Sequence, residues 1–511
     1  MITLTSIRVA CFAVCLGFLP SAWSQATPEN VTPTPAPSDN NNSNFLQILG
    51  RNFVQESVNL GACKKGLKGV IGCGQTLLTG NPLHIVVGSL APQNGVAGGL
   101  AFEDVYHPTY CASWLDGTPA PEPGTRNYCH WSLNMNATGE ASGKASWRAG
   151  VYVTATHIST RKPRPGRSGG SRGVCGVPHS FSTPSTSVGF YSESDSLNRL
   201  YFYGLGPSSR STDRAGFGLT ENVTGVNAVV PVTGGWFRDC GITVLGEING
   251  RFNSVRGTVG DTSPSIGTLY SEASAPGLTA SPGYFQAGQG LRLIPPIPAK
   301  ARLKLNYLVN FQEFVAPSAT RYSFRRFTAD LNHQFILYKK DGGKAPTPPP
   351  ALSGKVVPSY PPISTTRDKT GSITARMLIQ ESVANASHVV PFFLDPTIGG
   401  SDINGQSLLA SYPDYRLRAP NLLLIHGAFE QSLGRFPVGL FVGLDEGKVG
   451  LARDDISFNH LRHSYSAGIT IHAGGLPVVY VVFAWGGNEG HHIMGKVDTS
   501  LLGPGSRPSL F

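Results

Sequence analysis

Charge is scarce in this sequence. Asp, Glu, Lys and Arg together make up only 14 % of the 511 residues, against roughly 25 % in ordinary soluble domains. This low charge excludes a coiled coil and an acidic disordered protein. Lys and Arg exceed Asp and Glu by ten, and the excess is spread along the chain. A diffuse basic excess favours contact with anionic surfaces over one specific nucleic-acid site, so no nucleic-acid partner is expected.

Long apolar segments are missing beyond the N-terminus. The apolar run Val9–Leu19 is followed by small residues just before Gln25. This pattern is typical of a secretory signal, and the run is too short to span about 30 Å of hydrocarbon. We therefore expect a signal peptide over residues 1–24. No later segment reaches 18 continuous apolar residues, so a membrane-spanning helix is excluded.

Cysteine pairs with metal-binding spacing are also absent. No C-x-x-C occurs, and two of the eight cysteines fall within the expected signal. A zinc site is therefore not expected. An even number of remaining cysteines in an exported chain predicts disulfide bonds, with fifteen possible pairings. These six are Cys63, Cys73, Cys111, Cys129, Cys175 and Cys240, all in the first half of the chain.

Helical periodicity is hard to find, and alternation takes its place. In residues 465–473 (YSAGITIHA) apolar side chains alternate with Ser, Thr and His. A period of two with one polar face is the signature of a β-strand. The same alternation occurs at 146–158 (SWRAGVYVTATHI), 303–314 (LKLNYLVNFQEF), 326–338 (RFTADLNHQFILY) and 421–431 (NLLLIHGAFEQ).

Such strands are compatible with a soluble sandwich or with a membrane barrel. The strands recur over most of the chain without a helical interlude, and the chain is expected to be exported. In hydrocarbon a closed barrel satisfies every backbone hydrogen-bonding group. We therefore predict an all-β fold: a transmembrane antiparallel β-barrel of about 16 strands with long loops. It would occupy residues 49–511, after a disordered Pro/Thr/Asn-rich tail over residues 25–48.

The C-terminal part of the chain carries a specific pattern. Gly399-Gly400, an acidic Glu430 in an alternating strand, and Gly443-Leu444-Asp445 follow one another. In this order and spacing the chain resembles the BamA/TamA-type outer-membrane assembly family, the bacterial surface-antigen barrels. That family carries an aliphatic-Arg-Gly-aromatic tetrad in a loop that enters the barrel lumen. The corresponding residues here are Leu409, Ala410, Ser411 and Tyr412, without the arginine and the glycine.

The resemblance implies a site inside the barrel. The loop Gly399–Asn421 would fold into the lumen, where Tyr412 and Tyr415 would pack it against the wall. Alternation places Glu430 and Asp445 on the inner face of neighbouring strands, and two carboxylates so placed repel unless a cation lies between them. Arg416 and Arg418 are the candidate cations, because a guanidinium stays charged and bridges two carboxylates.

The function implied by the resemblance is insertion or export of proteins or lipids at the bacterial outer membrane. Its partners would be outer-membrane lipids, with lipopolysaccharide as one candidate, and protein substrates or assembly partners. The family's soluble periplasmic (POTRA) repeats are not expected, because the 25–48 tail cannot supply one. No enzymatic activity, cofactor or metal is expected.

Two other functions stay open. A barrel without soluble repeats also suits a passive pore or a structural surface protein, and a weakly basic lumen would then favour anions. The third interpretation is an exported hydrolase. Ser168 lies in a glycine-rich segment and His426 precedes Gly427. A nucleophile elbow, however, needs an apolar strand before the serine and a helix after it, and Ser168 has neither.

Overall fold

The computed structural model describes residues 83–106, 130–157, 185–232, 237, 240–258, 260–298, 301–340, 369–401, 407–433, 438–473, 476–487, 489 and 491–497. The expected signal peptide, the 25–48 tail, Ser168 and all of the expected mature cysteines except Cys240 lie outside these residues. The expectations about them stay predictions.

Strands dominate the described residues. The expected alternating segments at 303–314, 326–338, 421–431 and 465–473 fall in them, as do residues 147–157 of the segment 146–158. The strands of the first half are β1 (Leu83–Ser89), β2 (Val96–Tyr106), β3 (Trp131–Ser142), β4 (Trp147–His157), β5 (Ser187–Phe202), β6 (Ala215–Pro231), β7 (Ile242–Arg256) and β8 (Gly283–Leu293). Those of the second half are β9 (Leu303–Val315), β10 (Phe324–Lys340), β11 (Lys369–Val383), β12 (Thr397–Ile398), β13 (Leu417–Arg418), β14 (Asn421–Leu433), β15 (Val438–Gly450), β16 (Arg462–Ala473), β17 (Leu476–Trp485) and β18 (His491–Val497).

The helical elements that the structure describes are short. They are η1 (Ser211–Asp213), α5 (Ile266–Leu269), η3 (Thr320–Tyr322), η4 (Phe392–Leu394) and η5 (Arg453–Asp455). Within the described ranges no helix has the length and apolar character needed to cross a membrane.

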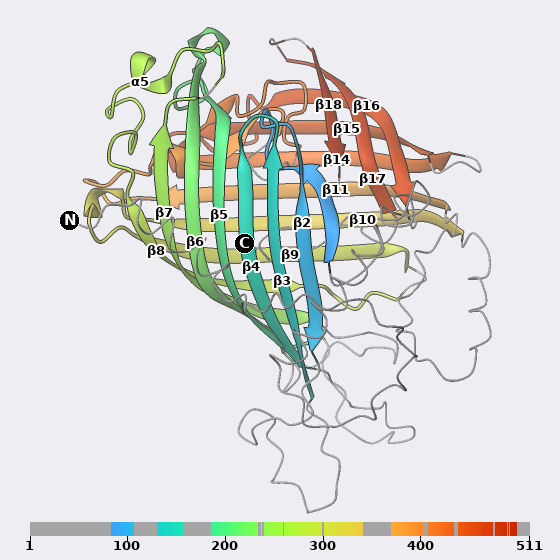
Figure 1. The fold of residues 1–511 in the computed structure, drawn as a ribbon. Helices are drawn as coiled ribbons and strands as arrows, with labels where there is room; N and C mark the ends of the chain where they lie inside the picture. Colours follow the sequence, from blue (N-terminus) through green and yellow to red (C-terminus); the bar gives the residue numbers. More distant parts are fainter. Residues whose placement is uncertain are drawn as a thin grey trace, which may run out of the picture. The chain divides into compact units, whose positions relative to one another are not determined.

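Sixteen strands form a single sheet in which every neighbouring pair is antiparallel (Figure 1). The order follows the sequence from β1 to β18, with β12 and β13 set apart as a separate two-stranded ladder. The expected all-β antiparallel fold is confirmed, as is the expected number of about 16 strands. The meander arises because each pair of consecutive strands is joined as a hairpin, for which no crossover is needed.

The sheet has polar residues on its buried face and apolar residues on its exposed face. In β7 the side chains of Val244, Ile248 and Phe252 are exposed, whereas Glu247 and Asn249, which alternate with them, are only 4 % and 2 % exposed. The same holds in β16, where Ile469 is exposed and its neighbour Thr470 is fully buried. A soluble protein distributes these residue types the other way round.

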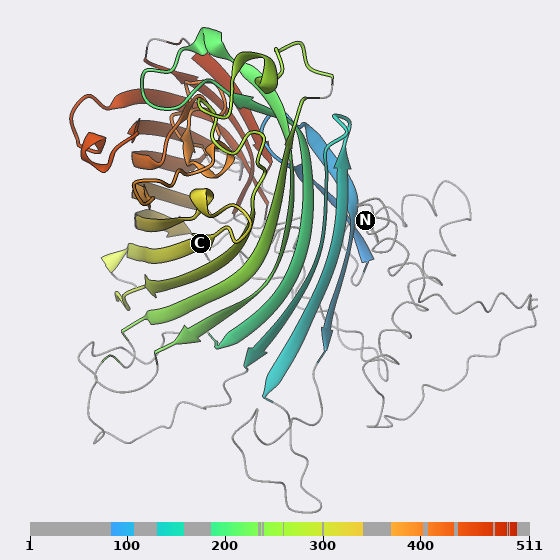
Figure 2. The same ribbon diagram turned by 90° about the vertical axis from the view of Figure 1, so that its left-hand side faces the viewer.

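The sheet curves round the connection between β11 and β14. Residues of this connection pack against β5 and β6 in one apolar cluster and against β11, β14 and β15 in another. Strands β5 and β14 lie seven positions apart in the sheet order, which is roughly 34 Å in a flat sheet at about 4.8 Å per strand. Tyr415 belongs to the first cluster and Tyr412, three residues before it, belongs to the second. Two strands so far apart in the order can contact neighbouring loop residues only because the sheet bends round the loop, as Figure 2 shows for the strands.

Three of the apolar clusters lie towards one end of the strands. The connections at this end follow β1, β3, β5, β7, β9, β11, β15 and β17. They carry the short helical elements and pack on one another through aromatic residues. Phe202, at the end of β5, and Phe392, in η4 of the β11–β14 connection, have ring centroids 4.9 Å apart. This end therefore holds the packed core, and it positions the site described next.

Candidate functional site

The connection between β11 and β14, residues 384–420, is here called the inward loop. It folds back on itself, so that Thr397 pairs with Arg418 and Ile398 with Leu417 in the β12–β13 ladder. Both Ile398 and Leu417 are fully buried. Because a polar connection of this length would ordinarily lie on the surface, its burial inside a curved sheet marks it as the candidate functional element.

A two-glycine turn shapes the loop. Gly399 and Gly400 have φ angles of +119° and +59°, a region in which residues with side chains are strained. A Cβ on Gly399 would also lie 2.6 Å from Cβ of Arg416 and 2.7 Å from the carbonyl oxygen of Pro413. The Gly399 amide donates to Leu408 O at 2.8 Å, which closes the turn. The Gly-Gly pair noted in the sequence is therefore required by close backbone packing.

The segment at the expected tetrad position contacts the strands at the end of the sheet. The amide of Ala410 donates to Asp445 Oδ2 at 3.2 Å, and that of Ser411 to Ser464 Oγ at 2.8 Å. Leu409 and Tyr412 are buried in the apolar cluster with β11, β14 and β15. The tetrad's Arg and Gly are absent here, and two backbone amides and the Ser411 hydroxyl make polar contacts instead.

Arg416 is almost fully buried, with 2 % of its side chain exposed, and makes three polar contacts. Its Nε donates to Glu489 Oε2 at 2.6 Å, and its two terminal nitrogens donate to Ser209 Oγ at 2.9 Å and Ser209 O at 2.7 Å. Its guanidinium carbon lies 5.2 Å from the ring centroid of Tyr203. This residue therefore joins the inward loop to the β5–β6 and β17–β18 connections.

Arg418 lies deeper, against aromatic rings. Its Nη1 donates to Phe392 O at 2.6 Å, and its guanidinium carbon is 5.8 Å from the Phe392 ring and 6.0 Å from the Phe217 ring. Asp395 lies in the same buried environment. Desolvation is the main cause that raises the pKa of Asp395 to about 8, partly opposed by Arg326 and Arg418. Desolvation likewise lowers the pKa of Arg418 to about 10.

The acidic residues expected to face these arginines have other contacts. Asp445 accepts from Nδ1 of His426 at 2.5 Å, because the two residues are direct cross-strand neighbours in β14 and β15. Glu430 accepts from Thr470 Oγ1 at 3.5 Å. Arg416 contacts Glu489 instead of either acid. The geometric reason is that the loop places Arg416 towards the β17–β18 connection, away from the middle of β14 and β15.

Gly443 and Tyr415 occupy two further expected positions. Gly443 lies opposite Ser466 in the β15–β16 ladder, and a Cβ on it would lie 2.5 Å from Ser466 Oγ. Tyr415 has only 1 % of its surface exposed, and its hydroxyl donates to Pro92 O at 3.1 Å. The inward loop thus contacts the β1–β2 turn as well as the far end of the sheet.

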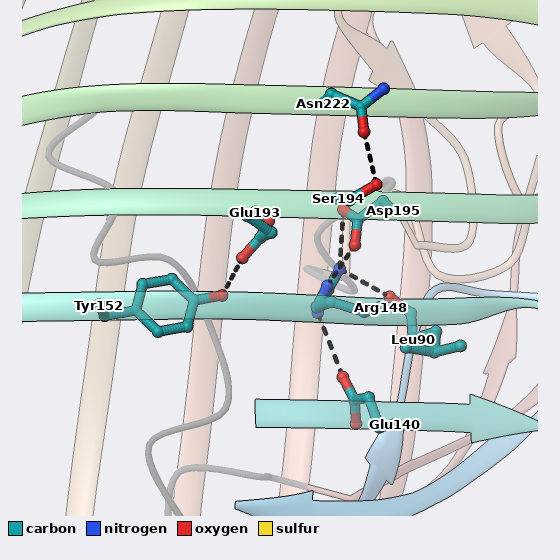
Figure 3. A network of polar contacts seen from close by, with 8 residues as sticks. All are labelled: Leu90, Glu140, Arg148, Tyr152, Glu193, Ser194, Asp195 and Asn222. Atoms are coloured by element: carbon teal, nitrogen blue, oxygen red, sulfur yellow. Dashed lines mark hydrogen bonds and ion pairs between the residues drawn. The ribbon is translucent and has the colours of Figure 1, made fainter. Parts of the chain in front are cut away.

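The wall beside the loop carries a charged ladder across β3, β4 and β5 (Figure 3). Arg148 donates through Nε to Asp195 Oδ1 at 2.7 Å, and its Nη1 lies 3.7 Å from Glu140 Oε1. Tyr152 donates to Glu193 on the same face. Direct register explains the ladder, because Arg148 pairs with Glu140 on one side and Asp195 on the other. Such cross-strand ion pairs fix the register of a polar wall.

A cavity of about 210 Å³ lies beside the loop, where four connections meet. Sequence patterns did not predict Glu489 or Ser209 as the partners of Arg416. For Glu489 the local signal is the Gly- and Asn-rich composition of the segment before β18, which indicates a turn. The cavity lining includes Gln93, Tyr203, Arg214, Asp414, Glu489 and His492.

Comparisons with known proteins give a similarity of strand arrangement at low identity. No family model and no curated protein matches the chain. CdiB from Acinetobacter baumannii is 10 % identical over 80 % of this chain and 56 % of that one, with a TM-score of 0.39. BamA from Haemophilus ducreyi lacking POTRA domains 1–3 is 9 % identical over 82 % and 69 %, with a TM-score of 0.42.

CdiB from Escherichia coli is 12 % identical over 81 % of this chain and 62 % of that one, with a TM-score of 0.42. The chain thus spans less than two thirds of the length of either CdiB structure. With TM-scores below 0.5, these matches assign no activity to the chain.

Proposed function

We propose that the chain is a non-enzymatic outer-membrane β-barrel that inserts or exports proteins, with the inward loop inside it. The observation that carries the membrane location is the inverted sheet, apolar on its exposed face and polar on its buried face. Exposed apolar residues recur on strands from β2 to β18, among them Leu100, Phe190, Phe311, Ile469 and Ile493. In water such a surface would be an aggregation site, whereas in a bilayer it contacts lipid.

The edges of the sheet support an activity on polypeptides. Strands β1 and β18 are the first and last strands of the sheet, each seven residues long. Parts of the two strands come within 8 Å between Cα atoms, yet no ladder joins them among the described residues. This junction is here called the seam. An unpaired strand edge is a template on which another chain can add a strand.

A passive pore is the second candidate function. The polar inner face, with its ladder of charged groups, is what a water-filled channel would present. The buried loop and the aromatic clusters that it forms with β5 and β6 oppose this function, because they occupy the interior at the loop-bearing end. A large steady conductance is therefore not expected.

Photo-crosslinking in proteoliposomes tests the proposed function. A crosslinker replaces Ile85, which alternates with buried Val86 in β1, and a matched one replaces lipid-exposed Ile248 in β7, away from the seam. The probe is a radiolabelled, urea-denatured outer-membrane β-barrel polypeptide. We expect adducts at Ile85 and none at Ile248. Equal labelling at both positions, or no adduct together with a large steady conductance, would contradict the proposal and favour the pore.

A further inference from the structure

At the seam the described residues leave room for a closing contact from outside the sheet. Every other pair of neighbours in the sheet, from β1–β2 to β17–β18, is joined by a ladder of backbone hydrogen bonds. At the seam the described residues of β1 and β18 show no such ladder, although the strands approach each other. The polar contacts of the inward loop lie near this place.

On the β1 side, the loop binds the turn between β1 and β2. Asp414 Oδ2 accepts from Nε2 of Gln93 at 2.7 Å. Gln93 has a φ angle of +68°, an uncommon conformation for a residue with a side chain. Asn94 holds this β1–β2 turn in place: it is fully buried and donates to Arg199 O at 2.8 Å. This attachment point is therefore rigidly tied to β5.

On the β18 side, the loop binds the connection between β17 and β18. Arg416 donates to Glu489 at 2.6 Å, and Ser411 Oγ donates to Gly486 O at 3.1 Å. A Cβ on Gly487 would contact the Tyr412 ring, with Cζ 2.5 Å away. The connection thus lies directly against the loop.

We propose that residues 411–416 form a clasp that holds the seam closed at the loop-bearing end, with Asp414 binding the β1–β2 turn and Arg416 binding the β17–β18 connection. The two binding residues are separated by a single residue in a buried stretch of backbone. A displacement of one hairpin is therefore transmitted to the other through a few bonds. The clasp requires only the seam and the loop, and it does not depend on the proposed export activity.

The clasp is built so that it can be released. The cavity of about 210 Å³ reaches both contacts of the clasp. It is lined by Gln93 and Asp414 from the first contact and by Glu489 from the second. Water that enters a polar space of this size competes for the same hydrogen bonds. The contacts are also few, which distinguishes the clasp from a continuous ladder of strand hydrogen bonds.

Two contacts in series make a specific prediction. The hydrogen bonds from Tyr415 to Pro92 and from Ser411 to Gly486 remain in every variant, so the comparison concerns only Gln93–Asp414 and Arg416–Glu489. If these two contacts act in series as one clasp, removing either should release the seam as much as removing both. Independent stabilising contacts would instead give additive effects. The variants are Gln93→Ala, Glu489→Gln and the double variant. Asp330→Asn is the matched control, because it breaks the 2.8 Å ion pair with Arg376 between β10 and β11, away from the seam.

The measurement is a pulsed electron paramagnetic resonance distance distribution across the seam, in full-length protein reconstituted in lipid. Spin labels are carried on non-canonical amino acids at Ser89 in β1 and Ile493 in β18, both of which are exposed. We expect a narrow distribution in the parent protein and in Asp330→Asn. Each clasp variant should raise the open-to-closed ratio by about tenfold, as the loss of one hydrogen bond to a charged group implies.

The double variant should give the same ratio as either single variant. Three results would overturn the clasp. One is an unchanged seam distance in both single variants, including the case in which their heat stability falls. Another is an additive effect in the double variant, and the third is an equal change in Asp330→Asn. None of these outcomes depends on the crosslinking result at Ile85, so failure of the clasp and failure of the proposed function can be told apart.

Discussion

Asp395 should make the heat stability of the protein depend on pH between about 5 and 9. Only 5 % of this residue is exposed, and neither carboxylate oxygen has a hydrogen-bond partner among the described residues. The charged groups that act on it are Arg326 from β10 and Arg418 from β13. Desolvation outweighs both arginines and raises the pKa from 3.8 to about 8.

The sign of the effect follows from this raised pKa. The folded protein holds the Asp395 proton more tightly than the unfolded chain does, so protonation stabilises the fold. That stabilisation is complete below about pH 4 and is lost as the pH rises through the folded pKa of about 8. At 1.36 kcal/mol per pKa unit the full shift corresponds to about 6 kcal/mol as an upper limit.

The assay is the temperature at which heating changes the electrophoretic mobility of the purified barrel, measured from pH 5 to pH 9. We expect this temperature to fall steadily across the range in the parent protein. Asp395→Asn keeps the shape and removes the charge, so its transition temperature should change much less with pH and should exceed that of the parent at pH 9. A flat profile in the parent, or the same slope in Asp395→Asn, would refute the reasoning.

Two further changes and one measurement on the unchanged protein have expected outcomes. Gly399→Ala should destabilise the loop by about 1–3 kcal/mol, because Gly399 has a positive φ and an added Cβ would contact Arg416. Gly246→Ala is the control and should not destabilise the protein, because an added Cβ there meets no atom within 4 Å. The heat-shift assay compares the two variants, and equal effects would count against the packed turn. Arg416→Ala combined with Arg418→Ala should lower the free energy of unfolding by about 3–5 kcal/mol, because buried partners are left unpaired, and should expose the loop to protease. Arg453→Ala is the control and should do neither, because the Arg453 side chain is 75 % exposed. Mass mapping of protein from native membranes should find disulfides among the six mature cysteines, and six free thiols would contradict that expectation.

The strands could be predicted because alternation is a local property. In β10 and β16, apolar and polar residues follow a period of two that is legible within a dozen residues. Alternation alone does not decide whether the apolar face points to a protein core or to lipid, because the same pattern occurs in a soluble sandwich. The number of strands followed from chain length and the absence of helical stripes. Burial of Tyr412 and Tyr415 was expected from the resemblance, and both are buried.

The partners of the charged residues could not be predicted in the same way. His426 and Asp445 face each other because Leu433 pairs with Val438 and fixes the register of that hairpin. A shift of the pairing by one residue would have placed the two side chains on opposite faces of the sheet. Glu489 lies 73 residues from Arg416 in the chain. Only the curvature of the whole sheet brings the two together, and no local pattern encodes that curvature.

Fractionation of the cell envelope tests the central claim most directly. The protein, expressed with its N-terminal segment, should be recovered with the outer membrane and should migrate faster on electrophoresis before heating than after it. That result is expected because the exposed apolar face requires lipid and the sheet stays folded in mild detergent. Recovery of correctly folded protein in the soluble periplasmic fraction, with no change in mobility on heating, would contradict the account.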